Sequence, residues 1–224
     1  MVRRLSPEEA IALNSWLRQA DTFYLDGRLL WLQDGIDGSC VLLWLSLEQL
    51  LKLLIFQARF KEGTLAAKPG QTIFETMDKT GRKLSSQNHQ LKDLIKEFDI
   101  HFPGLLAKRD LPILEKVQEY FTRRYVVNSS TAIALKLIED IDRLFFKLRD
   151  GVDAQVPLCF IDEIAFRREL GLGHQYLEHY MQYAYVNNKF FKRRKKYPTW
   201  RVQFMPGVVH IDSGRLSKIE VVDQ

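Results

Sequence analysis

"VLLWLSLEQLLKLLIF", residues 41–56, is the stretch that decides the fold. It predicts a helix over residues 38–58 with apolar side chains on nearly every side, in which Glu48 and Lys52, four residues apart, are the main polar pair. A helix with so little polar surface lies either at the centre of a fold or in a dimer interface. Because two charges interrupt the run and it is too short to span a bilayer, we interpret it as a buried helix.

A long helix precedes this stretch. The residues "SPEE" at 6–9 are typical of a helix start, with a hydroxyl cap, a proline at the first position and carboxylates near the positive end of the helix dipole. Apolar residues then recur at helical spacing as far as Leu32. Asp34, Gly35 and Gly38 predict the turn into the next helix.

Shorter elements follow the apolar stretch. Residues 61–72 predict a loop from their glycine, proline and lysine content, and a short helix is expected around residues 74–79. Ser85 or Ser86 then predicts the cap of a further helix over residues 87–99.

Two more long helices complete the first 150 residues. One is expected over residues 111–123, with Asp110 as its cap and Pro112 in its first turn. The other, over residues 134–148, has a continuous apolar face and ends at Gly151. Four long helices with modest loops predict a mainly α fold, an up-and-down four-helix bundle over residues 1–150.

The pattern changes after residue 151. Residues 159–191 predict two helices with a break at Gly171–Gly173, and residues 199–204, 207–211 and 218–222 alternate like short strands. We therefore expect a small C-terminal α+β extension over residues 151–224. "LGLGHQYLEHYM" (170–181) resembles the turn and second helix of a helix-turn-helix, so a winged-helix-like extension is one alternative.

One patch of the extension, between Glu178 and Asp212, carries the whole positive excess of the chain, whose formal net charge is +5. No acidic residue occurs between Glu178 and Asp212. Cations that neutralise phosphates, interleaved with aromatics that stack on bases, suit nucleic acid. The alternative is that the aromatics pack onto the bundle and the charges are solvated or pair with acids. The candidate nucleic-acid-binding residues are Lys189, Lys192, Arg193, Arg194, Lys195, Lys196, Tyr197, Trp200 and Arg201.

Four segments of the predicted bundle, taken in order, resemble a known family. They are "WLRQADTFYLDGRLL" (16–30), "SLEQLLKLLI" (46–55), "NHQLKDLI" (88–95) and "RRYVV" (123–127). In order and spacing, over residues 8–150, they are similar to the HEPN family, four-helix domains of prokaryotic toxins, antiphage systems and nucleotidyltransferase partners. The resemblance implies an up-and-down bundle, often a homodimer, and a nucleotidyltransferase as a candidate partner.

Arg123 and Arg124 stand where the RNA-cleaving members of that family carry a catalytic arginine. In those members a histidine follows after four to six residues, because the reaction needs a base for the ribose 2′-hydroxyl and a cation for the phosphate. Here the permitted positions, within residues 128–131, hold only asparagine, serine and threonine, which do not titrate near neutral pH. No catalytic residue is therefore expected. Two interpretations stay open for the arginine pair, a phosphate-binding site or a favourable helix end.

Other constellations predict no metal and no cofactor. Arg168 and His174 meet the family's spacing, but across a glycine break outside the bundle, which we interpret as coincidence. His174 and His179 are five residues apart, so on a helix they diverge by about 140° and do not meet one ion. Cys40 and Cys159 lack metal-ligand spacing and are expected to be reduced thiols.

Together these patterns predict a cytoplasmic protein with no secretory signal and no membrane association. Its expected function is that of a non-catalytic module that binds nucleic acid, RNA or DNA, or a nucleotide, in a toxin-antitoxin or defence context. Two alternatives stay open. One is a ribonuclease in which Arg123 or Arg124 works with a histidine from elsewhere, His89, His101 or His174. The other is a protein-interaction partner of a nucleotidyltransferase.

Overall fold

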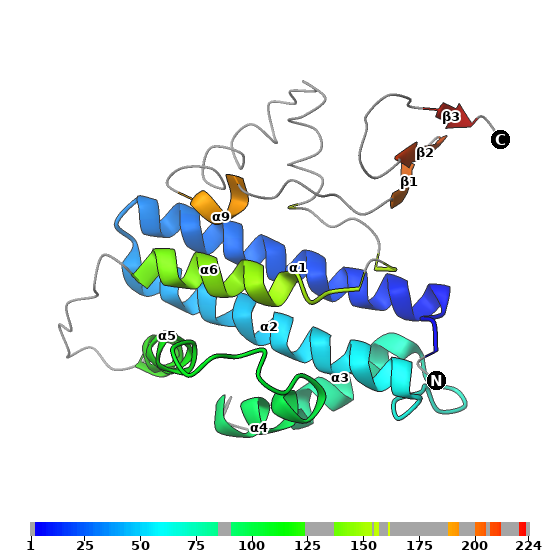
Figure 1. Cartoon of the computed structure of the whole chain (residues 1–224), viewed down its shortest axis with the longest axis horizontal. Helices are drawn as coiled ribbons and strands as arrows, with labels where there is room; N and C mark the ends of the chain where they lie inside the picture. The colour runs from blue at the N-terminus through cyan, green and yellow to red at the C-terminus, as the bar shows by residue number, and fades with distance from the viewer. Residues whose placement is uncertain are drawn as a thin grey trace.

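The fold is mainly α, as the sequence predicts. The computed structural model describes residues 3–84, 91–123, 137–153, 155–156, 161, 188–192, 200–204, 207–211 and 220–222. The helices are α1 (Pro7–Leu32), α2 (Ile36–Glu62), α3 (Ile73–Leu84), α4 (Leu91–His101), α5 (Leu111–Arg123), α6 (Leu137–Arg149) and the short α9 (Lys189–Lys192) (Figure 1). Outside the described residues lie Ser85 and Ser86, the predicted start of the last bundle helix at residue 134, and the helices expected between residues 162 and 187.

Three short strands form one antiparallel sheet. They are β1 (Trp200–Phe204), β2 (Gly207–Ile211) and β3 (Glu220–Val222), in the order β1-β2-β3. The register pairs Val202 with Val209, and Val209 with Val221. A C-terminal α+β extension, and its winged-helix-like form, stay predictions.

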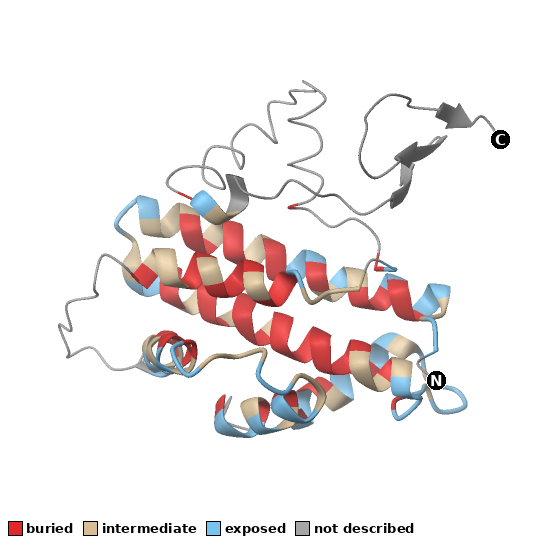
Figure 2. Cartoon of the chain, in the orientation of Figure 1, coloured by how far each residue is buried: buried red, intermediate tan, exposed pale blue. Residues whose placement is uncertain are grey.

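The apolar helix α2 lies at the centre of the molecule. It packs against α1, α3, α4, α5 and α6, and Figure 2 shows buried residues along nearly its whole length. The predicted polar pair is present, with the Lys52 ammonium 2.7 Å from a Glu48 carboxylate oxygen. Of the two positions that the sequence leaves open for this helix, the centre of the fold accounts for its apolar surface within a single chain.

The length of α2 was underestimated. The helix runs for 27 residues and ends at Gly63, whose φ of 73° is left-handed. Among the described helices, α2 is long enough and apolar enough to cross a membrane, judged by length and composition alone. The run at residues 41–56 is therefore the central part of a longer helix. Within the fold, 78% of its most apolar window is buried, as in the core helix of a globular protein.

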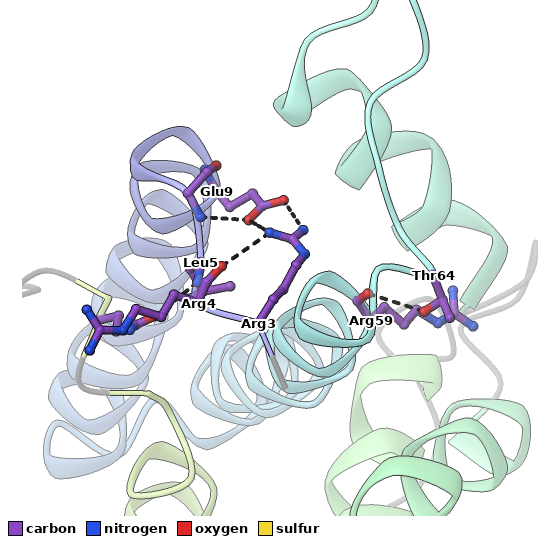
Figure 3. A network of polar contacts seen from close by, with 8 residues as sticks. Arg3, Arg4, Leu5, Glu9, Arg59 and Thr64 are labelled. Carbon is purple, nitrogen blue, oxygen red and sulfur yellow. Dashed lines mark hydrogen bonds and ion pairs between the residues drawn. The ribbon is translucent and has the colours of Figure 1, made fainter. Parts of the chain in front are cut away.

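Helix α1 begins with the predicted cap. The Ser6 hydroxyl accepts a hydrogen bond from the Glu9 amide at 3.2 Å, and the Glu9 carboxylate accepts one from the Ser6 amide at 2.8 Å. Arg3 completes the arrangement, because its two amino groups lie 2.9 and 2.5 Å from the two Glu9 oxygens (Figure 3). The Arg3 amide also donates to the Lys61 carbonyl at 3.3 Å, so the N-terminal segment is tied to the end of α2.

Helices α1 and α2 pack closely in antiparallel directions. The hydroxyls of Ser39 and Ser46 on α2 donate to the carbonyls of Gly27 and Ala20 on α1, at 2.7 and 2.8 Å. A Cβ atom at Gly27 would lie 2.8 Å from Cγ of Leu43, closer than side chains tolerate. The glycine therefore sets the distance between the two longest helices.

Two local predictions need correction. Gly38 lies inside α2 rather than in the turn, because the helix already begins at Ile36. Helix α3 covers residues 73–84 rather than 74–79, because Thr72 and Glu75 cap it reciprocally. The Thr72 hydroxyl accepts from the Glu75 amide at 3.1 Å, and the Glu75 carboxylate accepts from the Thr72 amide at 3.0 Å.

Asp110 holds the start of α5 against α6. Its carbonyl accepts the Leu114 amide, as expected at a helix start, but its carboxylate bonds with Arg143, Lys147 and the Ala107 amide, at 2.7, 2.7 and 2.9 Å. The Asp110 side chain, which was predicted to cap α5, therefore mainly links α5 to α6. Figure 1 shows α1, α2 and α6 side by side across the view, with α5 seen nearly along its axis. The up-and-down arrangement of four aligned helices stays a prediction.

Residues beyond 151 join the same core. Val156 and Ile161 are fully buried in it and Phe190 packs against it. Gln57 on α2 donates to the Gly151 carbonyl at 3.2 Å and accepts from the amide of Asp153 at 2.7 Å. The boundary at residue 151 stays a prediction, and α6 itself ends beside it, at Arg149.

We expect Gly27→Ala to lower the unfolding free energy by about 1–2 kcal/mol. Overpacking costs about 1–3 kcal/mol, and alanine returns up to about 1 kcal/mol of helix propensity. Gly38→Ala is the matched control, since its Cβ would meet only the terminal Cδ1 of Leu30 at 3.3 Å. Urea denaturation measures both, and equal effects of the two changes would contradict the close approach at Gly27.

The Asp110 carboxylate should make stability depend on pH. Burial alone raises its pKa, but hydrogen bonds from Lys147, Arg143 and the Ala107 amide outweigh burial, and the net pKa is lowered. Its contribution is therefore complete above the unfolded-state pKa of about 3.9 and is lost as pH falls through the lower folded-state value.

We expect Asp110→Asn to cost about 1–3 kcal/mol at neutral pH, because it leaves charged partners poorly compensated. The difference from wild type should begin to shrink below about pH 4 and disappear as pH falls through the lower folded-state pKa, below which the wild-type carboxylate is also neutral. Urea titrations at several pH values measure this, with the exposed Asp99→Asn as the control. A difference in unfolding free energy that stays constant across the pH range would show that the charge of the Asp110 carboxylate does not contribute to stability.

Candidate nucleic-acid interface

The basic run, Lys189 to Arg201, follows a buried residue. Asn188, immediately before α9, is fully buried, and its side-chain amide donates to the Tyr24 hydroxyl on α1 at 2.7 Å. The first residues of the run are therefore fixed to the bundle, 164 residues away in sequence from their partner.

Tyr24 is the centre of a buried polar network between α1 and α6. Its hydroxyl donates to the Asp142 carboxylate at 2.7 Å, and Arg28 donates to the other oxygen of that carboxylate. The Tyr24 ring stacks on Phe145, with centroids 3.7 Å apart and planes inclined by 2°. These four side chains and Asn188 leave the network almost no contact with water.

The surroundings keep the network in one protonation state at neutral pH. Burial and the Asp142 charge raise the pKa of Tyr24 well above its ordinary value, so the phenol stays neutral and donates. Burial raises the pKa of Asp142, while Arg28 and the Tyr24 hydroxyl oppose that change. Burial lowers the pKa of Arg28, but Tyr24 and Asp142 outweigh it, and the net pKa is raised. The guanidinium therefore stays charged against the carboxylate.

A second buried connection lies along the same two helices. Asp21 and Arg149 form a two-bonded ion pair, with nitrogen to oxygen distances of 2.8 and 2.9 Å. The same Asp21 carboxylate accepts the Ile161 amide at 3.0 Å. Asp21 and Tyr24 on α1 thus each bind a residue from beyond α6. The sequence signal was a row of polar residues, Asp21, Tyr24 and Arg28, at helical spacing within an apolar helix, and it was missed.

The structure places the predicted binding residues unevenly. The Lys189 ammonium pairs with Glu139 of α6, and Phe190 packs on the core, as the packing alternative predicts for these two residues. Lys192 ends α9, and Trp200 and Arg201 begin β1; the structure describes their backbone only. Outside the described residues lie Arg193, Arg194, Lys195, Lys196 and Tyr197. Among the described candidate cations, Lys189 is therefore the one whose ion-pair partner the structure shows.

The arginine pair is split between the described and the remaining residues. Arg123 is the last described residue of α5, and its side chain is not described. Arg124 and residues 128–131 lie outside the described residues. Phosphate binding and a simple helix end both stay open for this pair.

Of the histidines considered for a ribonuclease, His101 is described, whereas His89 and His174 lie outside. His101 Nδ1 is 3.0 Å from a Glu62 oxygen, and Nε2 is 3.5 Å from a Glu97 oxygen without hydrogen-bond geometry. Arg59 also bonds with Glu97. The two carboxylates face opposite nitrogens of the ring, so they do not converge on one metal ion. They would also repel a substrate phosphate from this imidazole.

Among the described residues, no group of three or more histidine, cysteine, aspartate and glutamate side chains is arranged to hold a metal ion. Cys40 is buried, and burial together with Asp37 raises the pKa of its thiol to about 12. This thiol is therefore protonated at neutral pH and a poor nucleophile.

We expect Tyr24→Phe to destabilise the protein by about 1–3 kcal/mol, because it leaves the buried Asp142 oxygen and the Asn188 amide without the hydroxyl between them. Hydrogen exchange at residues 188–192 should become faster at the same time. Thr22→Ala is the control, since the Thr22 hydroxyl on the same helix is exposed. Unchanged exchange in a destabilised Tyr24→Phe protein would show that the hydroxyl does not hold the start of the basic run.

Comparison of the chain with protein-family models, with curated proteins and with solved structures finds no match. The resemblance to the HEPN family therefore rests on the four quoted segments, and function has to be argued from the geometry of the chain itself.

Proposed function

We propose that this chain is a HEPN-like helical bundle with a C-terminal α+β extension that binds the phosphates of nucleic acid without cleaving them. The binding surface is the part of the basic run from Lys192 to Arg201. The observation that carries the proposal is the attachment of the start of this run to the bundle, through the buried Asn188 and the Lys189–Glu139 ion pair.

A buried attachment matters because it fixes where the cations begin. The run leaves the bundle at α6 and α9, and six cations follow Lys189 up to Arg201 with no acidic residue among them. Such an excess of charge is neutralised by a polyanion, and release of counterions drives the association. Tyr197 and Trp200, interleaved with the cations, suit stacking on unpaired bases.

The absence of cleavage is argued from chemistry. The positions that follow the arginine pair offer no base that titrates near neutral pH. Of the histidines considered for a ribonuclease, His101 is within the described residues, and it lies between two carboxylates, where a phosphate is repelled. A protein that binds RNA and leaves it intact is the outcome that these residues favour.

A homodimer and a cytoplasmic location belong to the proposal as well. Because α2 is covered within one chain, the dimer that the family resemblance implies needs another surface. Light scattering of the purified protein measures the mass directly.

The test is the affinity for RNA and DNA oligonucleotides as a function of salt. If about five cations of the run contact duplex phosphates, the log–log slope should be roughly −4 to −5. Changing Lys192, Arg193, Arg194, Lys195 and Lys196 together to alanine should flatten the slope and abolish most of the affinity.

The matched control changes five exposed lysines elsewhere, Lys68, Lys79, Lys83, Lys92 and Lys96, to alanine. It alters the net charge equally, so retained binding in this control assigns the affinity to the run rather than to overall charge. Equal binding by both quintuple variants would remove the run from consideration. Cleavage of labelled RNA by wild type, at high protein concentration and with or without EDTA, would instead support the ribonuclease alternative.

A further inference from the structure

Asp110 closes a turn whose tip consists of two cations. Its amide donates to the Ala107 carbonyl at 2.8 Å, and its carboxylate accepts the Ala107 amide at 2.9 Å. Lys108 and Arg109 occupy the two central positions and are exposed. Within the described part of the chain, neither has a recorded ion pair. The turn therefore presents two positive charges to solvent from a fixed backbone.

Two more cations reach the same carboxylate from α6. Arg143 and Lys147 each lie 2.7 Å from one Asp110 oxygen. The Asp110 side chain is fully buried, whereas 18% of the Arg143 side chain and 28% of the Lys147 side chain remain exposed. One buried carboxylate thus holds two cations at the surface, beside a turn that carries two others.

The cluster is more exposed than the buried ion pairs. Among the described residues, Arg28 pairs with Asp142 and Arg149 with Asp21, and each of these side chains is at most 2% exposed. The acids recorded beside the four cations at Asp110 are Asp110 itself and Asp140, whose oxygen lies 3.8 Å from Arg143. Four cations against two carboxylates leave a positive excess at the surface, which pairing for stability alone does not require.

Two cations of the cluster lie on α6, the helix that also pairs with the start of the basic run. Glu139, which holds Lys189, and the cations Arg143 and Lys147 follow one another at four-residue spacing on the less buried side of α6. At 1.5 Å per residue, eight residues of helix span about 12 Å. That length corresponds to roughly three to four nucleotides at about 3.4 Å each.

We propose that Lys108, Arg109, Arg143 and Lys147 form a second phosphate-binding site, on the bundle itself, for the strand that the C-terminal run binds. Asp110 positions Arg143 and Lys147, whose side chains stay partly exposed and so can meet a phosphate oxygen. The inference rests on the proposed function for the identity of the strand. The ligand chemistry, a phosphate at a surplus of oriented cations, rests on the cluster alone.

The test uses the full chain with Lys108 and Arg109 both changed to alanine, since these exposed residues carry no packing. The control is Lys92→Ala with Lys96→Ala on α4, the same charge change at exposed positions. The probes are single-stranded RNA and DNA of about 12 nucleotides, followed by fluorescence anisotropy across a salt series. Loss of two phosphate contacts should make the log–log slope shallower by roughly 1.4, at about 0.7 per contact, and weaken binding several-fold.

Equal slopes for the two double variants would overturn the second site. If the oligonucleotides bind and only the quintuple variant of the run loses them, the proposed function stands and this site falls. Inorganic tripolyphosphate is the independent probe, and it should raise the melting temperature of wild type more than that of the Lys108, Arg109 variant. A response to tripolyphosphate alone, without oligonucleotide binding, would keep this site and remove the proposed function.

No response to either probe would overturn both proposals. Polyglutamate separates nucleic acid from an acidic protein partner. If it binds through Lys108 and Arg109 as tightly as the oligonucleotides do, the cluster recognises carboxylates and the phosphate assignment is overturned.

Discussion

The structure depends on one constraint, that α2 has apolar side chains on nearly every side and must be covered on all of them. Burying a leucine or phenylalanine side chain stabilises a fold by about 1.5–3 kcal/mol, and α2 supplies such residues along its whole length. Helix α1 covers one side at a distance set by Gly27, and α3 to α6 cover the rest. The serine side chains on α2 are short enough for this close contact, and their hydroxyls donate hydrogen bonds to α1 carbonyls.

This constraint also decides where polar chemistry is located. Since α2 is occupied by packing, the extensive buried polar network lies between α1 and α6, where Tyr24, Arg28 and Asp142 meet. Buried ion pairs of this kind add little net stability, because desolvation offsets their attraction. Removing one partner is costly, however, so they favour a single arrangement. Here that arrangement includes Asn188 and Ile161, which brings the chain beyond α6 back to the bundle.

Patterns among neighbouring residues predicted much of the fold, but they do not identify contacts between residues that are distant in the sequence. The cap at Ser6 and the apolar α2 follow from neighbouring residues, and so were predicted. The cap at Thr72 was equally local and was overlooked. Tyr24 and Asp142 are 118 residues apart, and no spacing rule connects them. The basic run was evident from composition, whereas the pairing of Lys189 with Glu139 depends on how α9 meets α6.

The distribution of charge shows which cations are available for a ligand. A cation that is buried against one carboxylate, such as Arg149, is committed to the fold, whereas cations that outnumber their acids keep an external field. By sequence, the run after Lys189 has no acid among its cations, and the cluster at Asp110 has four cations beside two acids. Phosphate contacts fix position but do not read sequence, so under the proposed function such a surface would bind strands by their backbone. Any preference for unpaired strands must then come from aromatic stacking, for which Tyr197 and Trp200 are the residues within the run.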